Sequence, residues 1–153
     1  MNDRWEVIDG DVAVADGRIV DVGPRLDGST TPQRVIDAGG GLLLPGFVQT
    51  HVHLCQTIFR GLADDLRLLD WLRERIFPLE AAHTPASLQA STRLAVAELL
   101  RTGTTSILTM ETVHDTEAVL EALSESGIRA IVGKCLMDRD AVAPARMQQA
   151  VKP

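Results

Sequence analysis

The sequence has little of what directs a chain to a membrane, a nucleic acid or a disulfide-stabilised scaffold. Two cysteines in 153 residues make no disulfide framework. There is no basic block, and the net charge of −6 argues against a nucleic-acid polymer or an anionic membrane as partner. The longest apolar run, residues 41–48, is too short to span a bilayer, and no signal peptide is visible. We therefore expect a soluble, cytoplasmic protein that acts on a small molecule.

Residues 1–41 predict a small β unit, part of a β-sandwich-like domain. Two short apolar runs, 12–14 and 18–22, flank an Asp-Gly pair at 16–17, which is a strong hairpin signal. A third short run at 35–37 precedes three consecutive glycines. We expect about three strands here.

Residues 42–153 show alternating strand and helix patterns, and the 45% hydrophobic content supports a genuine core. Thr84-Pro85 favours a helix start, and Gly103 and Gly127 favour helix ends. This alternation implies parallel strands with right-handed crossovers. The expected strands are 42–53, 104–110 and 128–137; the expected helices are 66–77, 85–102 and one capped by Asp115 and running to 126, with another opening at Ala143-Pro144.

Two histidines, His51 and His53, close the first of these strands. Side chains two residues apart on a strand point to the same side, so both imidazoles should project together. Neutral imidazole is a preferred ligand of zinc and other first-row divalent metals. We interpret the pair as metal ligands; the alternative is two unrelated polar residues where a strand meets a loop. Cys55 could add a third ligand, although a buried thiol is the favoured interpretation.

Five segments resemble the metal-dependent amidohydrolase superfamily. The run Leu43-Leu44-Pro45-Gly46-Phe47-Val48-Gln49-Thr50-His51-Val52-His53 resembles its first barrel strand. The others narrow the match to the chlorohydrolase and adenosine-type deaminase branch, which includes deaminases of S-adenosylhomocysteine, methylthioadenosine and 5′-deoxyadenosine. These are Arg60–Leu66, Asp70–Leu72, Pro78–Glu80 and Arg101–Thr105. The resemblance extends from about residue 10 to residue 138.

The resemblance implies an α/β fold, the N-terminal part of a (β/α)8 TIM-type barrel that contributes about three βα units. One divalent metal ion is expected at the carboxyl ends of the strands, with His51 and His53 as ligands. The expected ion is Zn²⁺, with Fe²⁺ as the alternative.

The resemblance also assigns substrate-binding residues. Glu80 falls on the glutamate that binds the ribose hydroxyls of nucleosides, or else is a helix-end carboxylate that is solvated or paired with an arginine. Trp71 matches an aromatic position near the substrate, or else belongs to the core. Glu111 and His114 either line the pocket or serve the loop before Asp115. We expect His83 at the surface.

The implied reaction is hydrolytic deamination of an adenosine-like nucleoside. The metal lowers the pKa of bound water from about 15.7 toward about 7, the resulting hydroxide attacks the amine-bearing ring carbon, and a carboxylate moves the proton. A complete barrel takes about 250 residues, so we expect an N-terminal portion of a longer hydrolase, inactive alone, whose catalytic residues lie on later strands. The complete enzyme could be a homo-oligomer. The alternatives are a triazine or guanine amino- or chlorohydrolase, and a non-catalytic fragment or binding module.

Overall fold

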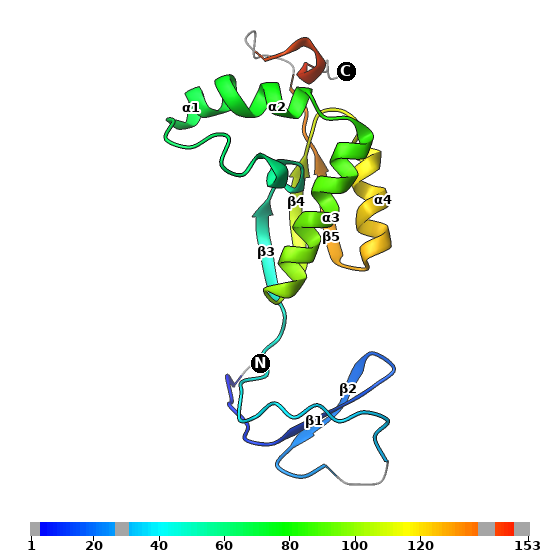
Figure 1. Cartoon of the computed structure of the whole chain (residues 1–153). Coiled ribbons are helices and arrows are strands. Elements are labelled where there is room, and N and C mark those ends of the chain that lie inside the picture. Colours follow the sequence, from blue (N-terminus) through cyan, green and yellow to red (C-terminus); the bar gives the residue numbers. More distant parts are fainter. Residues whose placement is uncertain (1–3, 27–30, 138–142, 149–153) are drawn as a thin grey trace. The chain divides into compact units, whose positions relative to one another are not determined.

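The computed structural model describes residues 4–26, 31–137 and 143–148. The chain divides into two compact units, residues 1–45 and residues 46–153 (Figure 1). No helix in the described ranges is long and apolar enough to cross a membrane.

The first unit is built on one antiparallel hairpin. Strands β1 (Asp11–Ala15) and β2 (Arg18–Gly23) pair as expected. Asp16 and Gly17, between them, both have positive φ angles, 50° and 72°, as the common two-residue hairpin turn requires. The expected third strand at 35–37 is wrong: these residues have no strand conformation, and β1 and β2 are the only strands in the described part of this unit.

The second unit contains a three-stranded parallel sheet in the order β3-β4-β5 (Figure 1). Two strands are shorter than expected, β3 (Phe47–Val52) and β5 (Arg129–Lys134). The middle strand, β4 (Thr104–Glu111), begins where expected and is one residue longer. β3 begins only after Pro45, which has no N–H for a strand ladder. The predicted strand-helix-strand alternation is confirmed.

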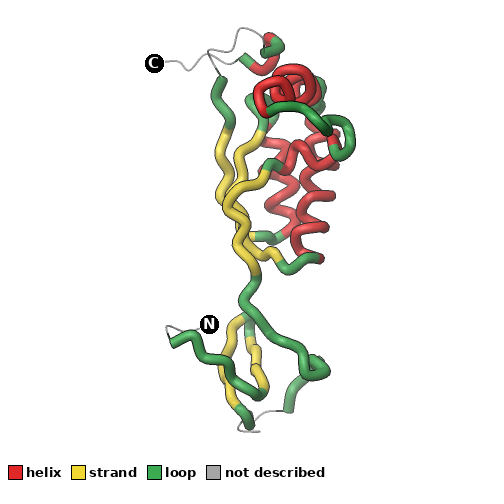
Figure 2. Tube along the Cα trace, turned by 90° about the vertical axis from the view of Figure 1, so that its left-hand side faces the viewer, coloured by secondary structure: helices red, strands yellow, loops and turns green. Residues whose placement is uncertain are grey.

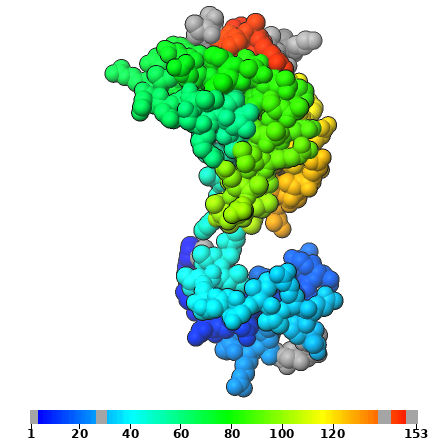
Figure 3. Space-filling model, in the orientation of Figure 1, coloured from blue at the N-terminus to red at the C-terminus, as the bar shows by residue number. Residues whose placement is uncertain are grey.

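Two helices, α3 (Pro85–Arg101) and α4 (Thr116–Ser126), cover one face of this sheet (Figure 2). Their solvent sides form one continuous surface in the space-filling view (Figure 3). Leu100 near the end of α3 and Leu120 on α4 are 45% and 47% exposed and lie outside the core. The core between sheet and helices contains Leu54, Cys55, Leu88, Ala95, Val96, Ile107, Ala118, Val119, Leu123 and Ile128.

The opposite face of the sheet is apolar and, among the described residues of this unit, uncovered. Leu108 and Met110 on β4 and Ile131 on β5 are 46–68% exposed, and they alternate with Ile107 and Val132, which pack on the helix side. A parallel sheet is normally covered on both faces. Both faces of this sheet are therefore apolar enough to be packed against other elements, but among the described residues helices cover only one of them.

The ends of α3 agree with the sequence signals. Thr84 accepts a hydrogen bond from the Ser87 N–H, and Ser87 Oγ accepts one from the Thr84 N–H, so the two form a reciprocal cap. Gly103 comes after the helix with a φ of 91°. For α4 the expected side-chain cap is wrong: Asp115 has a left-handed backbone, φ 52°, and makes no capping hydrogen bond. Its carboxylate binds other side chains instead.

The helix expected over 66–77 is present as three consecutive helical segments, of which the middle one is π-helical. These are α1 (Leu68–Trp71), a π-helical turn (Leu72–Ile76) and α2 (Phe77–Ala81). Within these segments Ile76 is buried, whereas Leu68 and Leu69 are 67% and 60% exposed.

Short 3₁₀ segments complete the second unit. One, Leu54–Phe59, comes soon after β3. A helix was expected to open at Ala143-Pro144, but the structure has only the 3₁₀ turn Ala145–Met147 there. The rest of that expected helix, from residue 149 onward, lies outside the described residues.

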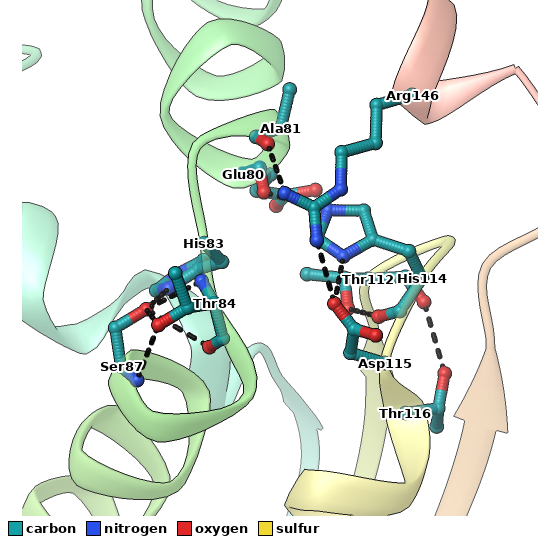
Figure 4. Close-up of polar contacts among 10 residues, drawn as sticks. All are labelled: Glu80, Ala81, His83, Thr84, Ser87, Thr112, His114, Asp115, Thr116 and Arg146. Carbon is teal, nitrogen blue, oxygen red and sulfur yellow. Dashed lines mark hydrogen bonds and ion pairs between the residues drawn. The ribbon is translucent and has the colours of Figure 1, made fainter.

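His83, expected at the surface, is only 2% exposed. Its Nε2 donates to the Cys55 carbonyl oxygen at 2.9 Å, and its Nδ1 lies 2.8 Å from Ser87 Oγ (Figure 4). The loop before α3 therefore turns this ring inward, against the segment after β3. Burial lowers the pKa of His83 below its ordinary value of 6.5.

Gly46 explains the close approach of the chain to β4. A Cβ at this position would lie 2.7 Å from Thr105 Cβ, closer than packed carbons allow. We expect Gly46→Ala to lower the free energy of unfolding of the second unit by about 1–3 kcal/mol. The measurement is urea unfolding monitored by circular dichroism at about 222 nm, because all the described helices lie in this unit. Gly133→Ala on β5 is the matched control, since the nearest atom to its added Cβ is 3.6 Å away. Equal effects of the two variants would contradict this account.

The buried His83 predicts a pH dependence of stability. Because its pKa is lowered in the folded state, its contribution is present above pH 6.5 and is lost as the pH falls below that value. Over that range the free energy of unfolding should fall by at most about 1.4 kcal/mol per pH unit through this one group. Urea unfolding at about pH 7.5, 6.5 and 5.5 should show a smaller loss for His83→Gln, which carries no titratable ring. An identical loss in variant and wild type would contradict the assignment.

Candidate metal and substrate site

The two histidines lie together at the carboxyl end of β3. His51 is on the strand and His53 comes directly after it. Their ring centroids are 5.2 Å apart, with the ring planes at 87°. The prediction that period-two spacing brings the imidazoles side by side is confirmed.

The environment of His53 leaves one ring nitrogen available for a metal. Its Nδ1 lies 2.7 Å from the Met110 carbonyl oxygen, and because a carbonyl only accepts, Nδ1 carries the proton. In the neutral imidazole the lone pair is then on Nε2. A ring N–H bound to a backbone carbonyl is the usual support of a metal-ligating histidine. His51 and His53 thus have the donor chemistry of two metal ligands. Among the described residues, no group of three or more His, Cys, Asp or Glu side chains forms a complete site.

The segment after His53 is held by buried polar side chains. The Glu111 carboxylate, at the end of β4, accepts hydrogen bonds from the backbone N–H groups of Leu54 (3.0 Å) and Cys55 (3.1 Å). Ser91 Oγ on α3 donates to the Leu54 carbonyl at 2.7 Å. Glu111 is 2% exposed, and this burial raises its pKa against the opposing effect of its hydrogen bonds. The structure therefore shows Glu111 bound to the backbone of this segment.

Glu80 lies on α2 and is 8% exposed. Its carboxylate accepts from Gln56 Nε2 at 2.9 Å and from Cys55 Sγ at 3.7 Å. Burial raises the pKa of Glu80, while the Gln56 hydrogen bond acts in the opposite direction. Sequence reasoning missed Gln56, which carries no signal of its own apart from its place a few residues after the two histidines.

Cys55 is a buried thiol, as favoured from the sequence. It is 1% exposed, and burial raises its pKa, with the nearby Glu111 and Glu80 carboxylates acting in the same direction. Its Sγ donates to the Glu80 carboxylate at 3.7 Å, so the thiol is engaged within the protein.

His114 belongs to a polar cluster next to Glu80. Its Nε2 lies 2.9 Å from the Glu80 carbonyl oxygen and its Nδ1 2.9 Å from the Asp115 carboxylate (Figure 4). Arg146 donates to the same carboxylate at 2.8 Å and to the Ala81 carbonyl at 3.2 Å. Both nitrogens of His114 are thus engaged within the protein. Hydrophobic patterning gave no signal for Arg146, because its contacts with Ala81 and Asp115 join residues that are far apart in the sequence.

Two hollows open near these residues. One, of about 350 Å³, is lined by Val113, His114, Asp115, Lys134, Arg146 and Gln148. The other, of about 220 Å³, is lined by residues that include Gln56, Ile76 and the half-buried Trp71. Trp71 and His114 therefore line different hollows, and Gln56 connects the second one to Glu80.

Comparison with known proteins places the chain in a family. The model of the amidohydrolase family matches residues 42–152. A 5-methylthioadenosine/S-adenosylhomocysteine deaminase from Nitratidesulfovibrio vulgaris is 43% identical over 133 residues, which are 86% of this chain and 30% of the relative. This chain thus spans less than a third of the length of that relative.

Two solved structures share the fold. A guanine deaminase from C. acetobutylicum with bound guanine is 27% identical, with a TM-score of 0.72, over 90% of this chain and 33% of the other. An adenosine deaminase from Xanthomonas campestris with bound zinc is 38% identical, with a TM-score of 0.55, over 67% of this chain and 23% of the other. The family match covers most of the chain and contains both histidines and all the candidate substrate residues. The chain therefore belongs to the amidohydrolase family.

Proposed function

We propose that this chain forms the N-terminal part of a metal-dependent (β/α)8-barrel hydrolase. We further propose that the enzyme deaminates an adenosine-like nucleoside of the 5′-deoxyadenosine, S-adenosylhomocysteine or methylthioadenosine type, in the cytoplasm. The observation that carries the proposal is the pair His51 and His53 at the carboxyl end of a parallel strand, with Nδ1 of His53 bound to a backbone carbonyl. The deaminase from Nitratidesulfovibrio vulgaris, similar over 86% of this chain, supports the reaction class.

His51 and His53 would hold one divalent ion, Zn²⁺ with Fe²⁺ as the alternative. When bound, such an ion acidifies water and supplies a nucleophile at neutral pH. The zinc in the Xanthomonas structure supports this choice. A catalytic zinc usually takes three protein ligands, so we expect the remaining ligands, and the carboxylate that moves the proton, from residues outside the described part of the chain.

Glu80 is our proposed ribose-binding residue. Its carboxylate already accepts from Gln56 and Cys55, which hold it in place without a cationic partner among those contacts. Vicinal hydroxyls of a ribose could donate to the same carboxylate in charge-assisted hydrogen bonds, which are stronger than neutral ones. Trp71, at the end of α1, would contribute an aromatic side chain to the pocket of about 220 Å³ that Gln56 also lines.

Glu111 and His114 stay predictions as substrate-contacting residues. Each one uses its polar atoms for contacts within the protein. We propose that His114 shapes the 350 Å³ hollow through its bonds to Asp115 and to the Glu80 backbone.

A second candidate function is deamination of a free base such as guanine. The similarity to the guanine deaminase with bound guanine, at 27% identity, favours it. The two candidates share the metal and differ in whether the substrate carries a ribose. They therefore differ in what they require of Glu80.

Removal of either histidine should remove the metal. In the full-length enzyme, His51→Ala and His53→Ala should each lose most bound metal and nearly all turnover, because each takes one ligand from the ion. The control is Gln49→Ala, two residues before His51 on the same strand, which removes a polar side chain without an imidazole. Metal analysis by mass spectrometry is the measurement. Full metal content in either histidine variant would refute the ligand assignment.

Removal of the Glu80 carboxylate should distinguish the two substrates. We expect Glu80→Ala to lower kcat/KM for 5′-deoxyadenosine by about ten- to a hundred-fold, through hydrogen bonds worth about 1.5–3 kcal/mol each. Turnover of guanine, which has no ribose, should fall much less. Glu121→Ala is the control, because Glu121 also accepts from a glutamine, Gln89, but on the exposed surface between α3 and α4. Equal losses on both substrates, or a wild-type preference for the free base, would favour the second candidate.

A further inference from the structure

We propose that Glu111 is a positioning residue for the metal ligand His53, acting through the backbone of the two residues after it. This inference rests on the proposed metal site. Glu111 binds the backbone of the segment after His53, whereas the His53 imidazole binds the Met110 carbonyl.

The geometry is that of a two-pronged acceptor. One carboxylate oxygen, Oε1, accepts from the Leu54 N–H, and the other, Oε2, accepts from the Cys55 N–H. Leu54 and Cys55 are the first residues of the 3₁₀ segment Leu54–Phe59, whose first N–H groups have no partners within the segment itself. Both residues are buried, so water cannot replace the carboxylate. Glu111 therefore determines where the chain turns after His53.

The same stretch of β4 holds the imidazole. Met110, the neighbour of Glu111, accepts the hydrogen bond from His53 Nδ1 through its carbonyl. Thr109 Oγ1 lies 2.9 Å from the Val52 carbonyl and also contacts the Glu111 carboxylate. Three consecutive residues of β4 thus contact the chain from Val52 to Cys55. A shift of the Glu111 contact would displace the backbone on the carboxyl side of His53 while its ring remains bound to β4.

Other contacts of this segment fix its carbonyls and leave its N–H groups to Glu111. Ser91 donates to the Leu54 carbonyl, and His83 donates to the Cys55 carbonyl. Ser91 and His83 act as donors in these contacts, so they do not compete with Glu111 for the N–H groups of Leu54 and Cys55. The sharpest change is therefore Glu111→Gln, which keeps the volume but places an NH₂ group, a donor only, against one of the two N–H donors.

The test uses the full-length protein, stripped of metal with a chelator. Zn²⁺ affinity is measured by competition with a chromophoric chelator, and the visible spectrum is recorded after loading with Co²⁺. We expect Glu111→Gln to weaken Zn²⁺ binding by about ten- to a hundred-fold and to change the cobalt spectrum. Glu121→Gln makes the same chemical change on the exposed α3–α4 surface and should alter neither.

Wild-type Zn²⁺ affinity and cobalt spectrum in Glu111→Gln would overturn the proposal, even if that variant unfolds at a lower urea concentration. If Glu111→Gln does not fold, Thr109→Val takes its place: it keeps the side-chain shape and removes the hydroxyl between Val52 and Glu111. A several-fold loss of Zn²⁺ affinity in Thr109→Val supports the proposal, and unchanged affinity overturns it. If the proposed metal site itself is wrong, the result is different: His51→Ala binds Zn²⁺ with the affinity of the wild-type protein.

Discussion

The structure around the site depends on satisfying buried backbone groups where the chain leaves β3. An N–H or carbonyl buried without a partner costs free energy comparable to a lost hydrogen bond. Here the N–H groups of Leu54 and Cys55 donate to the Glu111 carboxylate of β4. The carbonyls of the same two residues accept hydrogen bonds from Ser91 on α3 and from His83 in the loop before it. The strand end that carries the histidines is therefore held by three separate parts of the second unit.

This constraint explains why buried polar side chains gather beside a hydrophobic core. Glu80, His83, Ser91 and Glu111 are all buried, and each has hydrogen-bond partners in the segment that begins at Leu54. The apolar core, centred on Leu88, Val96 and Val119, lies between the sheet and α3 and α4. Apolar packing places the strands, and the polar side chains fix the loop at their carboxyl ends. A rigid sheet with a specified loop is the arrangement on which barrel enzymes build their sites.

Local patterns in the sequence predicted much of this fold. The hairpin at Asp16 and Gly17, the start of α3 at Thr84 and the pairing of His51 with His53 each depend on residues a few positions apart. The alternation of strands and helices was sufficient to predict the parallel sheet. The uncovered apolar face of that sheet agrees with the proposed barrel, in which further strands would continue it.

What the sequence could not predict depends on contacts between distant residues. Glu111 binds Leu54, 57 positions away, because parallel pairing with a crossover brings these strand ends together. His83 precedes a helix start, a place typical of exposed residues, yet its ring is drawn inward by the Cys55 carbonyl. Asp115 has the residue type of a helix cap, but His114 and Arg146 occupy its carboxylate. In each case a tertiary partner overrides the local preference of the residue.

The most direct test of the account is X-ray absorption at the zinc edge of the full-length, metal-loaded protein. We predict a first coordination shell of nitrogen and oxygen at about 2.0–2.2 Å, with the multiple-scattering pattern of at least two imidazoles. No sulfur shell should appear, because the Cys55 thiol is buried against Glu80 and Glu111. A sulfur shell at about 2.3 Å, or a first shell without imidazole scattering, would contradict the account.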